Sequence, residues 1–275
     1  MNKGIFYESN SFYSEKIRGN MRYSIYLPSN YNNESRKYPV IYLLHGHDGN
    51  EISWKRKGLI DQTFDSMIEQ GEMPPMVAVM PDAKNSWYVN SPSGIMYESA
   101  LVEDLTEYIQ KNYKVYSNRE NRFIAGISMG GYGALKLAFK YPDKFLAAAS
   151  LSGAILKDVP PEKETDLDGN EIKVREKFYH DAYGEPFDPV FWEKENVFNY
   201  IQNLKDCGLE LPVYISCGNE DYFYLYQGAV ELYHQLRKNK IPTELYIKNG
   251  NHDWLLWSQE IKEVLKFITR SIQLY

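Results

Sequence analysis

Short apolar runs alternate with amphipathic stretches along most of the chain. Runs that are apolar throughout favour strands covered on both faces of a parallel sheet. Such strands are expected at residues 38–44, 76–80, 122–125, 145–151 and 213–217, with a further strand at 244–247. Stretches with apolar residues on one face predict amphipathic helices. These helices are expected at residues 58–70, 95–111, 224–239 and 259–271.

Two regions depart from this alternation. Near the N-terminus, residues 10–15 and 21–27 read as a β-hairpin, with Gly19-Asn20 as its expected turn. Residues 154–200 lie between two expected core strands but are polar, with prolines and aromatic residues. Strands that alternate with helices predict a mainly parallel α/β sheet. We therefore expect one domain over residues 1–275, with 154–200 as an insertion above the carboxyl ends of the strands, where ligands bind in such sheets.

Charge and composition exclude some partners. The 275 residues carry 31 Lys+Arg and 37 Asp+Glu, a net charge of −6, without a basic block. We therefore expect neither nucleic acid nor an anionic membrane surface as a partner. There is no run of 18 apolar residues for a membrane span, and residues 1–20 lack the apolar centre of a signal peptide. The chain as it stands is expected to be cytoplasmic, or secreted if a signal has been removed.

The segment Gly126-Ile127-Ser128-Met129-Gly130 carries the strongest chemical signal. It reads G-x-S-x-G, follows the apolar run 122–125 and precedes a helix that opens on small residues. A strand, a sharp turn with serine at its apex and a helix form a nucleophile elbow, and glycines allow the turn. Ser128 is the predicted nucleophile. The motif by itself also fits an ordinary glycine-rich turn, so the interpretation depends on its partners.

A serine hydroxyl needs a base and an acid that orients the base. The histidines of the chain are His45, His47, His180, His234 and His252. His252 lies between the last expected strand and the closing helix, where an α/β-hydrolase holds its base, so we predict this role for it. The acid is expected in the loop after the preceding strand, and there Asp221 is favoured over Glu220. The order serine, acid, histidine fits this type of enzyme.

An oxyanion hole requires two backbone N–H donors. One is expected from Met129, directly after the nucleophile. The other is expected from His47, in the loop His45-Gly46-His47-Asp48-Gly49 after the first long strand. His45 itself is expected mainly to brace this loop.

Several pieces together resemble one known family. They are residues 38–54 with His-Gly-x-x-Gly and a Trp, 80–82 with 87–88, 126–133, 217–224, and 250–254 with Trp257. From about residue 10 to 270, the chain resembles the esterase D or putative esterase family of α/β-hydrolases. That family includes S-formylglutathione hydrolases, tributyrin-type esterases, feruloyl and acetyl-carbohydrate esterases, enterochelin esterases and mycolyltransferases. The resemblance implies the α/β-hydrolase fold, nucleophile Ser128, acid Asp221, base His252, and oxyanion donors His47 and Met129.

The implied activity is hydrolysis of a carboxylic ester through an acyl-enzyme, without a metal or an organic cofactor. Short-chain or aromatic acyl esters are expected, with acetyl or feruloyl groups on plant carbohydrate as candidates. Aromatic residues near the motif loops are expected to bind substrate, with packing beneath the loops as the equal alternative. These residues are Trp54, Trp87, Tyr88, Tyr222 and Trp254. The expected partner is a small-molecule or carbohydrate ester, and a homo-oligomer stays open.

Other functions on the same fold are an acyltransferase, in which an alcohol replaces water, and a thioesterase that resembles S-formylglutathione hydrolase. The thioesterase is less favoured because no basic cluster near the elbow would bind a charged tripeptide. A non-catalytic protein is disfavoured by the intact Ser128, Asp221 and His252.

Residues 166–170, Asp-Leu-Asp-Gly-Asn, resemble part of a calcium loop. They lack the bidentate glutamate at the required distance, so an Asp-Gly turn is favoured and no metal site is expected.

Overall fold

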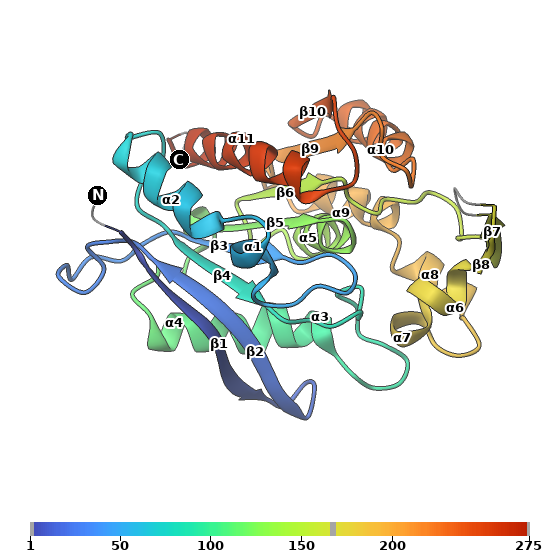
Figure 1. The fold of residues 1–275 in the computed structure, drawn as a ribbon, viewed down its shortest axis with the longest axis horizontal. Helices are drawn as coiled ribbons and strands as arrows, with labels where there is room; N and C mark the ends of the chain where they lie inside the picture. Colours follow the sequence, from blue (N-terminus) through green and yellow to red (C-terminus); the bar gives the residue numbers. More distant parts are fainter. Residues whose placement is uncertain (1–2, 166–168, 274–275) are drawn as a thin grey trace.

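The computed structural model describes residues 3–165 and 169–273 (Figure 1). One eight-stranded sheet has the order β1-β2-β4-β3-β5-β6-β9-β10. Its strands are β1 Ile5–Ser14, β2 Gly19–Leu27, β3 Val40–Leu44, β4 Val77–Pro81, β5 Arg122–Ile127, β6 Ala147–Leu151, β9 Val213–Gly218 and β10 Thr243–Lys248. Strand β2 runs antiparallel to β1 and β4, and every pair from β4 to β10 is parallel. The predicted mainly parallel α/β sheet is confirmed.

Helices cover both faces of this sheet. They are α1 Ser53–Arg56, α2 Ile60–Glu69, α3 Tyr97–Ser99, the π-helical turn η1 Ala100–Leu105, α4 Thr106–Asn112, α5 Met129–Lys140, α10 Tyr226–Lys238 and α11 Trp254–Gln273. In β3, Ile41 and Leu43 pack with α1, α2 and α11, whereas Val40, Tyr42 and Leu44 pack with α4, α5 and α10. Alternate side chains of a strand point to opposite faces, which explains why this strand is apolar throughout.

The segment between β6 and β9 has its own small elements. They are β7 Lys163–Thr165, β8 Glu171–Lys173, α6 Val174–Phe178, α7 His180–Tyr183, α8 Pro189–Lys194, the 3₁₀ turn η3 Val197–Tyr200 and α9 Ile201–Asp206. Figure 1 shows β7, β8 and α6 to α8 together at one side of the sheet. Tyr179, Tyr183 and Trp192 are buried in the same apolar cluster as α5, so this segment shares the core of the sheet. One domain with an insertion at 154–200 stays a prediction.

Two local expectations are wrong. The hairpin turn lies at residues 15–18, because Gly19 already pairs with Ser14 in the ladder and Arg18 takes the left-handed conformation at φ 50°. The helix expected over 95–111 begins at Tyr97 and includes the π-helical turn η1. There the Thr106 hydroxyl donates to the Leu101 carbonyl at 3.0 Å, a side-chain bond that periodicity could not indicate.

Residues 166–168 of the expected Asp-Gly turn lie outside the described residues. Within the described parts of the chain, each helix is too short or too polar to cross a membrane.

Candidate active site

The turn between β5 and α5 holds Ser128 in an unusual backbone conformation. Its φ of 53° and ψ of −121° are costly for a residue with a side chain, on the order of 1–3 kcal/mol. The turn is possible only because Gly126 and Gly130 have no side chains. A Cβ on Gly126 would lie 2.2 Å from the Gly130 carbonyl oxygen, and one on Gly130 would lie 2.5 Å from that of His45. This close packing presents Ser128 between the strand and the helix, as the motif predicted.

The structure brings Ser128, His252 and Asp221 together. The Oγ of Ser128 lies 3.0 Å from Nε2 of His252, and Nδ1 of the same ring lies 2.8 Å from Oδ2 of Asp221. Asp221 is 1 % exposed and His252 is 8 % exposed. The competing Glu220 is exposed. Asp253 instead accepts the Leu256 N–H at 3.0 Å at the start of α11, which is a helix-capping contact.

Two further groups bind the Asp221 carboxylate. The backbone N–H of Phe223 donates to Oδ1 at 3.0 Å, and the Cys217 thiol donates to Oδ2 at 3.5 Å. Burial, with Asp221 nearby, raises the pKa of Cys217 to about 12. The thiol therefore stays neutral and keeps its proton for this bond. Sequence analysis did not find this contact, because it depends on the turn that follows β9.

Aromatic rings enclose the imidazole of His252. Tyr222, Phe223 and Trp257 approach it edge to face, with ring centroids 5.6, 5.1 and 4.9 Å away. The Nε1 of Trp257 donates to the Ser152 hydroxyl at 3.1 Å, which fixes that ring. Between these rings, the imidazole directs Nδ1 at Asp221 and Nε2 at Ser128.

The loop after β3 packs directly on the elbow. A Cβ on Gly46 would lie 3.1 Å from the Cβ of Ser128. His47 is half-buried beside it, with Nδ1 3.2 Å from Oδ2 of Asp48. Met129 opens α5, and the first N–H groups of a helix have no partner within the helix. The loop after β3 and the start of α5 therefore both lie beside the serine.

A cavity of about 390 Å³ opens in front of Ser128. It is lined by residues of β5, of the loops after β3, β5, β9 and β10, and of the helical segments α1, α6 and α11: Gly46, His47, Asp48, Gly49, Ser53, Lys57, Ile127, Ser128, Phe178, Tyr222, Phe223, His252, Asp253, Trp254 and Trp257. Phe178, from the segment between β6 and β9, contacts Phe223 at 6.1 Å and His47 at 5.4 Å between ring centroids, both edge to face. That segment therefore supplies one wall of the cavity.

Two of the aromatic residues expected to bind substrate line this cavity. Tyr222 is 42 % exposed there and Trp254 is half-buried. Phe178 and Phe223 also line it, although sequence analysis missed both. Phe178 lies in a polar stretch with no motif, and nothing short of the fold places it beside Ser128.

The other three expected residues are corrected. Trp54, Trp87 and Tyr88 are buried away from the cavity. Their polar atoms are used in internal hydrogen bonds: Trp54 Nε1 to the Leu44 carbonyl at 3.1 Å, Trp87 Nε1 to the Phe178 carbonyl at 2.6 Å and the Tyr88 hydroxyl to the His45 carbonyl at 2.9 Å. These three rings pack beneath the loops, which was the alternative interpretation of the sequence.

The described residues contain no cluster of side chains suited to a metal ion. Their His, Cys, Asp and Glu side chains form no group of three or more that could hold an ion.

Comparison with known proteins identifies related esterases. Residues 14–268 match the family described as putative esterase. The acetyl esterase of Caldicellulosiruptor saccharolyticus is 25 % identical over 94 % of this chain and 97 % of its own length. Esterase Rv1288 of Mycobacterium tuberculosis is 34 % identical, over 52 % of this chain and 31 % of its own length. The endo-1,4-beta-xylanase/feruloyl esterase of Xylanibacter ruminicola is 26 % identical, over 80 % of this chain and 30 % of that protein.

Solved structures show the same fold. A ferulic acid esterase superposes with a TM-score of 0.81 at 24 % identity, covering 99 % of this chain and 100 % of that one. An S-formylglutathione hydrolase of Staphylococcus aureus superposes with a TM-score of 0.75 at 21 % identity, covering 97 % of this chain and 98 % of that one. The predicted α/β-hydrolase fold is thereby confirmed. Because the family match runs through nearly the whole chain, the chain belongs to the putative esterase family and is a carboxylesterase.

Proposed function

We propose that Ser128, His252 and Asp221 are the catalytic triad of this esterase. The observation that carries the proposal is the continuous line of hydrogen bonds from Ser128 Oγ through His252 to Asp221, at 3.0 and 2.8 Å. A carboxylate can only accept, so Nδ1 of His252 carries the proton on that side. Nε2 is then free to accept the serine proton, which is the arrangement that a serine nucleophile requires.

The reaction proceeds in two steps. His252 takes the proton of Ser128 as Oγ attacks the acyl carbonyl, and the negative oxygen is bound by the backbone N–H groups of His47 and Met129. His252 then gives the proton to the leaving alcohol. Water, deprotonated by the same ring, attacks the acyl-enzyme and releases the acid and the free serine.

The proposed substrate is an ester of a short or aromatic acyl group, with acetyl or feruloyl esters of plant carbohydrate as the leading candidates. The cavity of about 390 Å³ supports this class, because Phe178, Phe223 and Trp254 offer apolar ring surfaces around the nucleophile. The names of the relatives, an acetyl esterase and a xylanase/feruloyl esterase, point in the same direction.

An acyltransferase and a thioesterase of the S-formylglutathione type would use the same triad. Among the described residues that line the cavity, Lys57 is the one lysine or arginine. It would provide a charged tripeptide with a single cationic contact, so we favour an uncharged ester.

The experiment is a comparison of substrates with matched serine variants. Ser128→Ala should lower kcat by a factor on the order of 10⁶, whereas Ser93→Ala, on an exposed loop, should leave it unchanged. Full activity in Ser128→Ala would refute the triad. Asp221→Asn against Glu220→Gln tests the choice of acid in the same way.

The substrate panel would contain p-nitrophenyl acetate, butyrate and octanoate, methyl ferulate and acetylated xylan. Ser128-dependent release from ferulate or xylan supports the carbohydrate-ester proposal. Release confined to short p-nitrophenyl esters would indicate a general short-chain esterase. Transfer of the acyl group to an added alcohol in preference to water would indicate an acyltransferase.

A further inference from the structure

We propose that His45 is a positioning residue of the oxyanion hole, which holds the peptide bond between Gly46 and His47 so that the His47 N–H faces the nucleophile. The proposal rests on the proposed function, because it concerns one of the two donors assigned there. It assigns to His45 a specific effect on the transition state, beyond the bracing of a loop.

The two ring nitrogens of His45 have partners that leave no choice of tautomer. Nε2 lies 3.0 Å from the backbone nitrogen of Ala83, and Nδ1 lies 2.8 Å from the carbonyl oxygen of Gly46. A backbone N–H can only donate and a carbonyl can only accept. The ring is therefore neutral, with its proton on Nδ1.

The surroundings keep the ring in this neutral form. His45 is fully buried, and this burial lowers its pKa, as does the ammonium of Lys84; the Gly46 carbonyl and the carboxylates of Asp82 and Glu51 act in the opposite direction without reversing the shift. The ring of Tyr88 covers it at 5.9 Å between centroids. A charged imidazole would lose its capacity to accept from Ala83.

The bond to Gly46 sets the direction of the next N–H group. The Gly46 carbonyl also accepts the Gly49 N–H at 3.0 Å, so it is held from two sides. In a planar trans peptide the C=O and the following N–H point in opposite directions. With the carbonyl held towards His45 and Gly49, the His47 N–H is directed away from them. The same peptide lies against the nucleophile, because a Cβ on Gly46 would be 3.1 Å from that of Ser128.

This arrangement explains the spacing His-Gly-x-x-Gly. A Cβ on Gly49 would lie 3.0 Å from Nδ1 of His45 and 2.9 Å from the Gly46 carbonyl oxygen. A side chain there would push apart the two groups whose bond orients the peptide.

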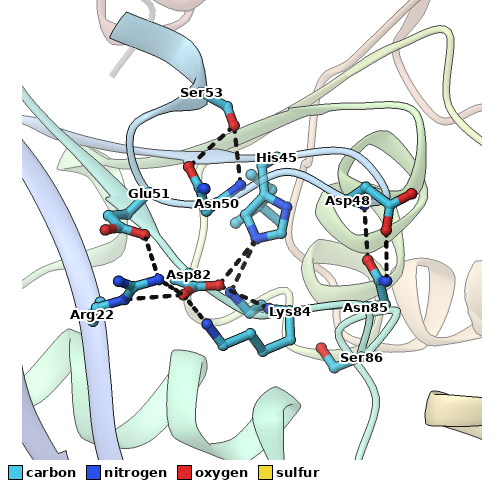
Figure 2. Close-up of polar contacts among 12 residues, drawn as sticks. Arg22, His45, Asp48, Asn50, Glu51, Ser53, Asp82, Lys84, Asn85 and Ser86 are labelled. Atoms are coloured by element: carbon cyan, nitrogen blue, oxygen red, sulfur yellow. Dashed lines mark hydrogen bonds and ion pairs between the residues drawn. The ribbon is translucent and has the colours of Figure 1, made fainter. Parts of the chain in front are cut away.

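A second layer holds the Ala83 N–H in place. Asp82 donates its own N–H to the Arg22 carbonyl at 2.8 Å and accepts the Lys84 N–H on Oδ1 at 3.1 Å. Its Oδ2 pairs with the Arg22 guanidinium at 3.0 Å and with the Lys84 ammonium. Figure 2 shows the His45 ring above Asp82 and Lys84, with Arg22 and Glu51 to one side. Strand β2 and the residues that follow β4 thus support the ring that orients the loop after β3.

Two substitutions separate the two bonds of the ring. The amide nitrogen of Asn lies about where Nδ1 of histidine lies, so His45→Asn keeps a donor for Gly46 and loses the acceptor for Ala83. The amide oxygen of Gln reaches about as far as Nε2, so His45→Gln keeps the acceptor and loses the donor. Thr106→Val is the matched control, since it removes another buried bond from a side chain to a carbonyl, at 3.0 Å.

The readouts are kcat, KM, Tm and the inhibition constant of a trifluoromethyl ketone, which forms a tetrahedral oxyanion on the serine. His45→Gln should lower kcat about 10- to 100-fold, and weaken binding of the ketone by the same factor, with little change in KM. Complete loss of an oxyanion donor lowers kcat by about 10²–10³, and this variant should misplace the donor without removing it. His45→Asn should stay within about threefold of the original enzyme on the same scale. Thr106→Val should lower Tm only.

The proposal would be overturned if kcat fell equally in His45→Gln and His45→Asn. It would also be overturned if kcat in His45→Gln fell no more than in Thr106→Val. If His45→Gln does not fold, nitrogen NMR of the unsubstituted enzyme can determine the protonation of the His45 ring. An Nε2–H tautomer or a charged ring at pH 7 would overturn the proposal. Activity that survives Ser128→Ala would instead refute the triad, so the two failures are distinguishable.

Discussion

Two polar networks lie beside the nucleophile elbow, and they differ in the charge of the group at their centre. Beneath the loop after β3, the neutral ring of His45 joins two backbone groups, with the charged side chains of Asp82, Arg22 and Lys84 behind it. On the side of α5 that faces the segment between β6 and β9, the contacts at the centre are ion pairs between buried side chains.

The second network centres on Lys136 of α5, which is fully buried. Its ammonium pairs with Glu98 and, at 2.8 Å, with Glu195, and Lys140 pairs with Glu98 at 2.7 Å. The Tyr141 hydroxyl donates to Glu98 at 2.6 Å. Burial by itself would raise the pKa of Glu98, but the two lysines and these bonds hold it at about 2. Glu195 follows α8, so the network connects the elbow helix to the segment that carries Phe178.

The difference shows two uses of buried polarity. A neutral ring with one donor and one acceptor directs neighbouring backbone atoms at a small cost in desolvation. Buried charges hold whole elements together, but removing one leaves its partners unpaired, which is far more costly. We therefore expect changes of the His45 ring to alter kcat and changes of the buried charges in the second network to alter stability.

Lys136→Met should have the largest effect on stability. It leaves two buried carboxylates without their central cation, and we expect the free energy of unfolding to fall by about 3–5 kcal/mol. Urea unfolding measures this loss, and kcat per folded molecule should change little. Lys140→Met is the matched control with a smaller loss, since Lys140 is 24 % exposed. A drop in kcat greater than that of His45→Gln would contradict the division between the networks.

Acid should destabilise the protein through Glu98. Its pKa is lowered from 4.5 to about 2 on folding, so it stabilises the folded state above pH 4.5. That contribution, roughly 3 kcal/mol, should be lost as the pH falls from 4.5 towards 2. Urea unfolding between pH 6 and 3 measures the slope. Glu98→Gln should flatten it, and an unchanged slope in this variant would show that Glu98 is not the group concerned.

Phe178→Ala should affect the choice of substrate. Phe178 lines the cavity, and it belongs to the segment between β6 and β9 that the second network holds to α5. Loss of its edge-to-face contacts should lower kcat/KM for methyl ferulate about tenfold, about 1.4 kcal/mol, and affect p-nitrophenyl acetate less. Phe187→Ala is the control, because Phe187 packs on Tyr183 in the same segment outside the cavity lining. Equal losses for both esters would refute a role in acyl selection.

Asp82→Asn should have the smallest effect on stability, about 1 kcal/mol, because its ion-pair partners are substantially exposed. The side chains of Arg22 and Lys84 are 47 % and 59 % exposed. The asparagine keeps an oxygen for the Lys84 N–H, so the Ala83 N–H should stay in place. Thermal unfolding compared with Lys84→Gln measures the effect. A loss as large as that of Lys136→Met would show that the two networks do not differ.

Sequence reasoning succeeded where the signal is local. Continuous apolar runs predicted the parallel strands to within a few residues, and the motif around Ser128 predicted the elbow, because steric limits on a tight turn are visible as glycines. The choice of Asp221 and His252 followed from their places after the last two strands, whose carboxyl ends meet at one edge of the sheet.

The sequence did not predict features that depend on the direction of a side chain or on contacts between residues far apart in the chain. Trp54, Trp87 and Tyr88 stand near the motifs along the chain but point into the core. Phe178 stands far from them in the sequence but reaches the cavity. Periodicity likewise gave no indication of the π-helical turn at Ala100–Leu105 or of the small elements between β6 and β9.

The sequence by itself determined the order of the core strands along the chain, the tight turn at Ser128 and the residues that we propose as acid and base. Each of these depends on hydrophobic period, steric limits or position along the chain, which are properties of neighbouring residues. The tertiary structure alone decided which aromatic rings face the cavity, that Cys217 binds Asp221, and that His45 is held between Gly46 and Ala83. These contacts join residues far apart in the chain or depend on how one turn places a side chain, so only the packed fold brings their atoms within bonding distance.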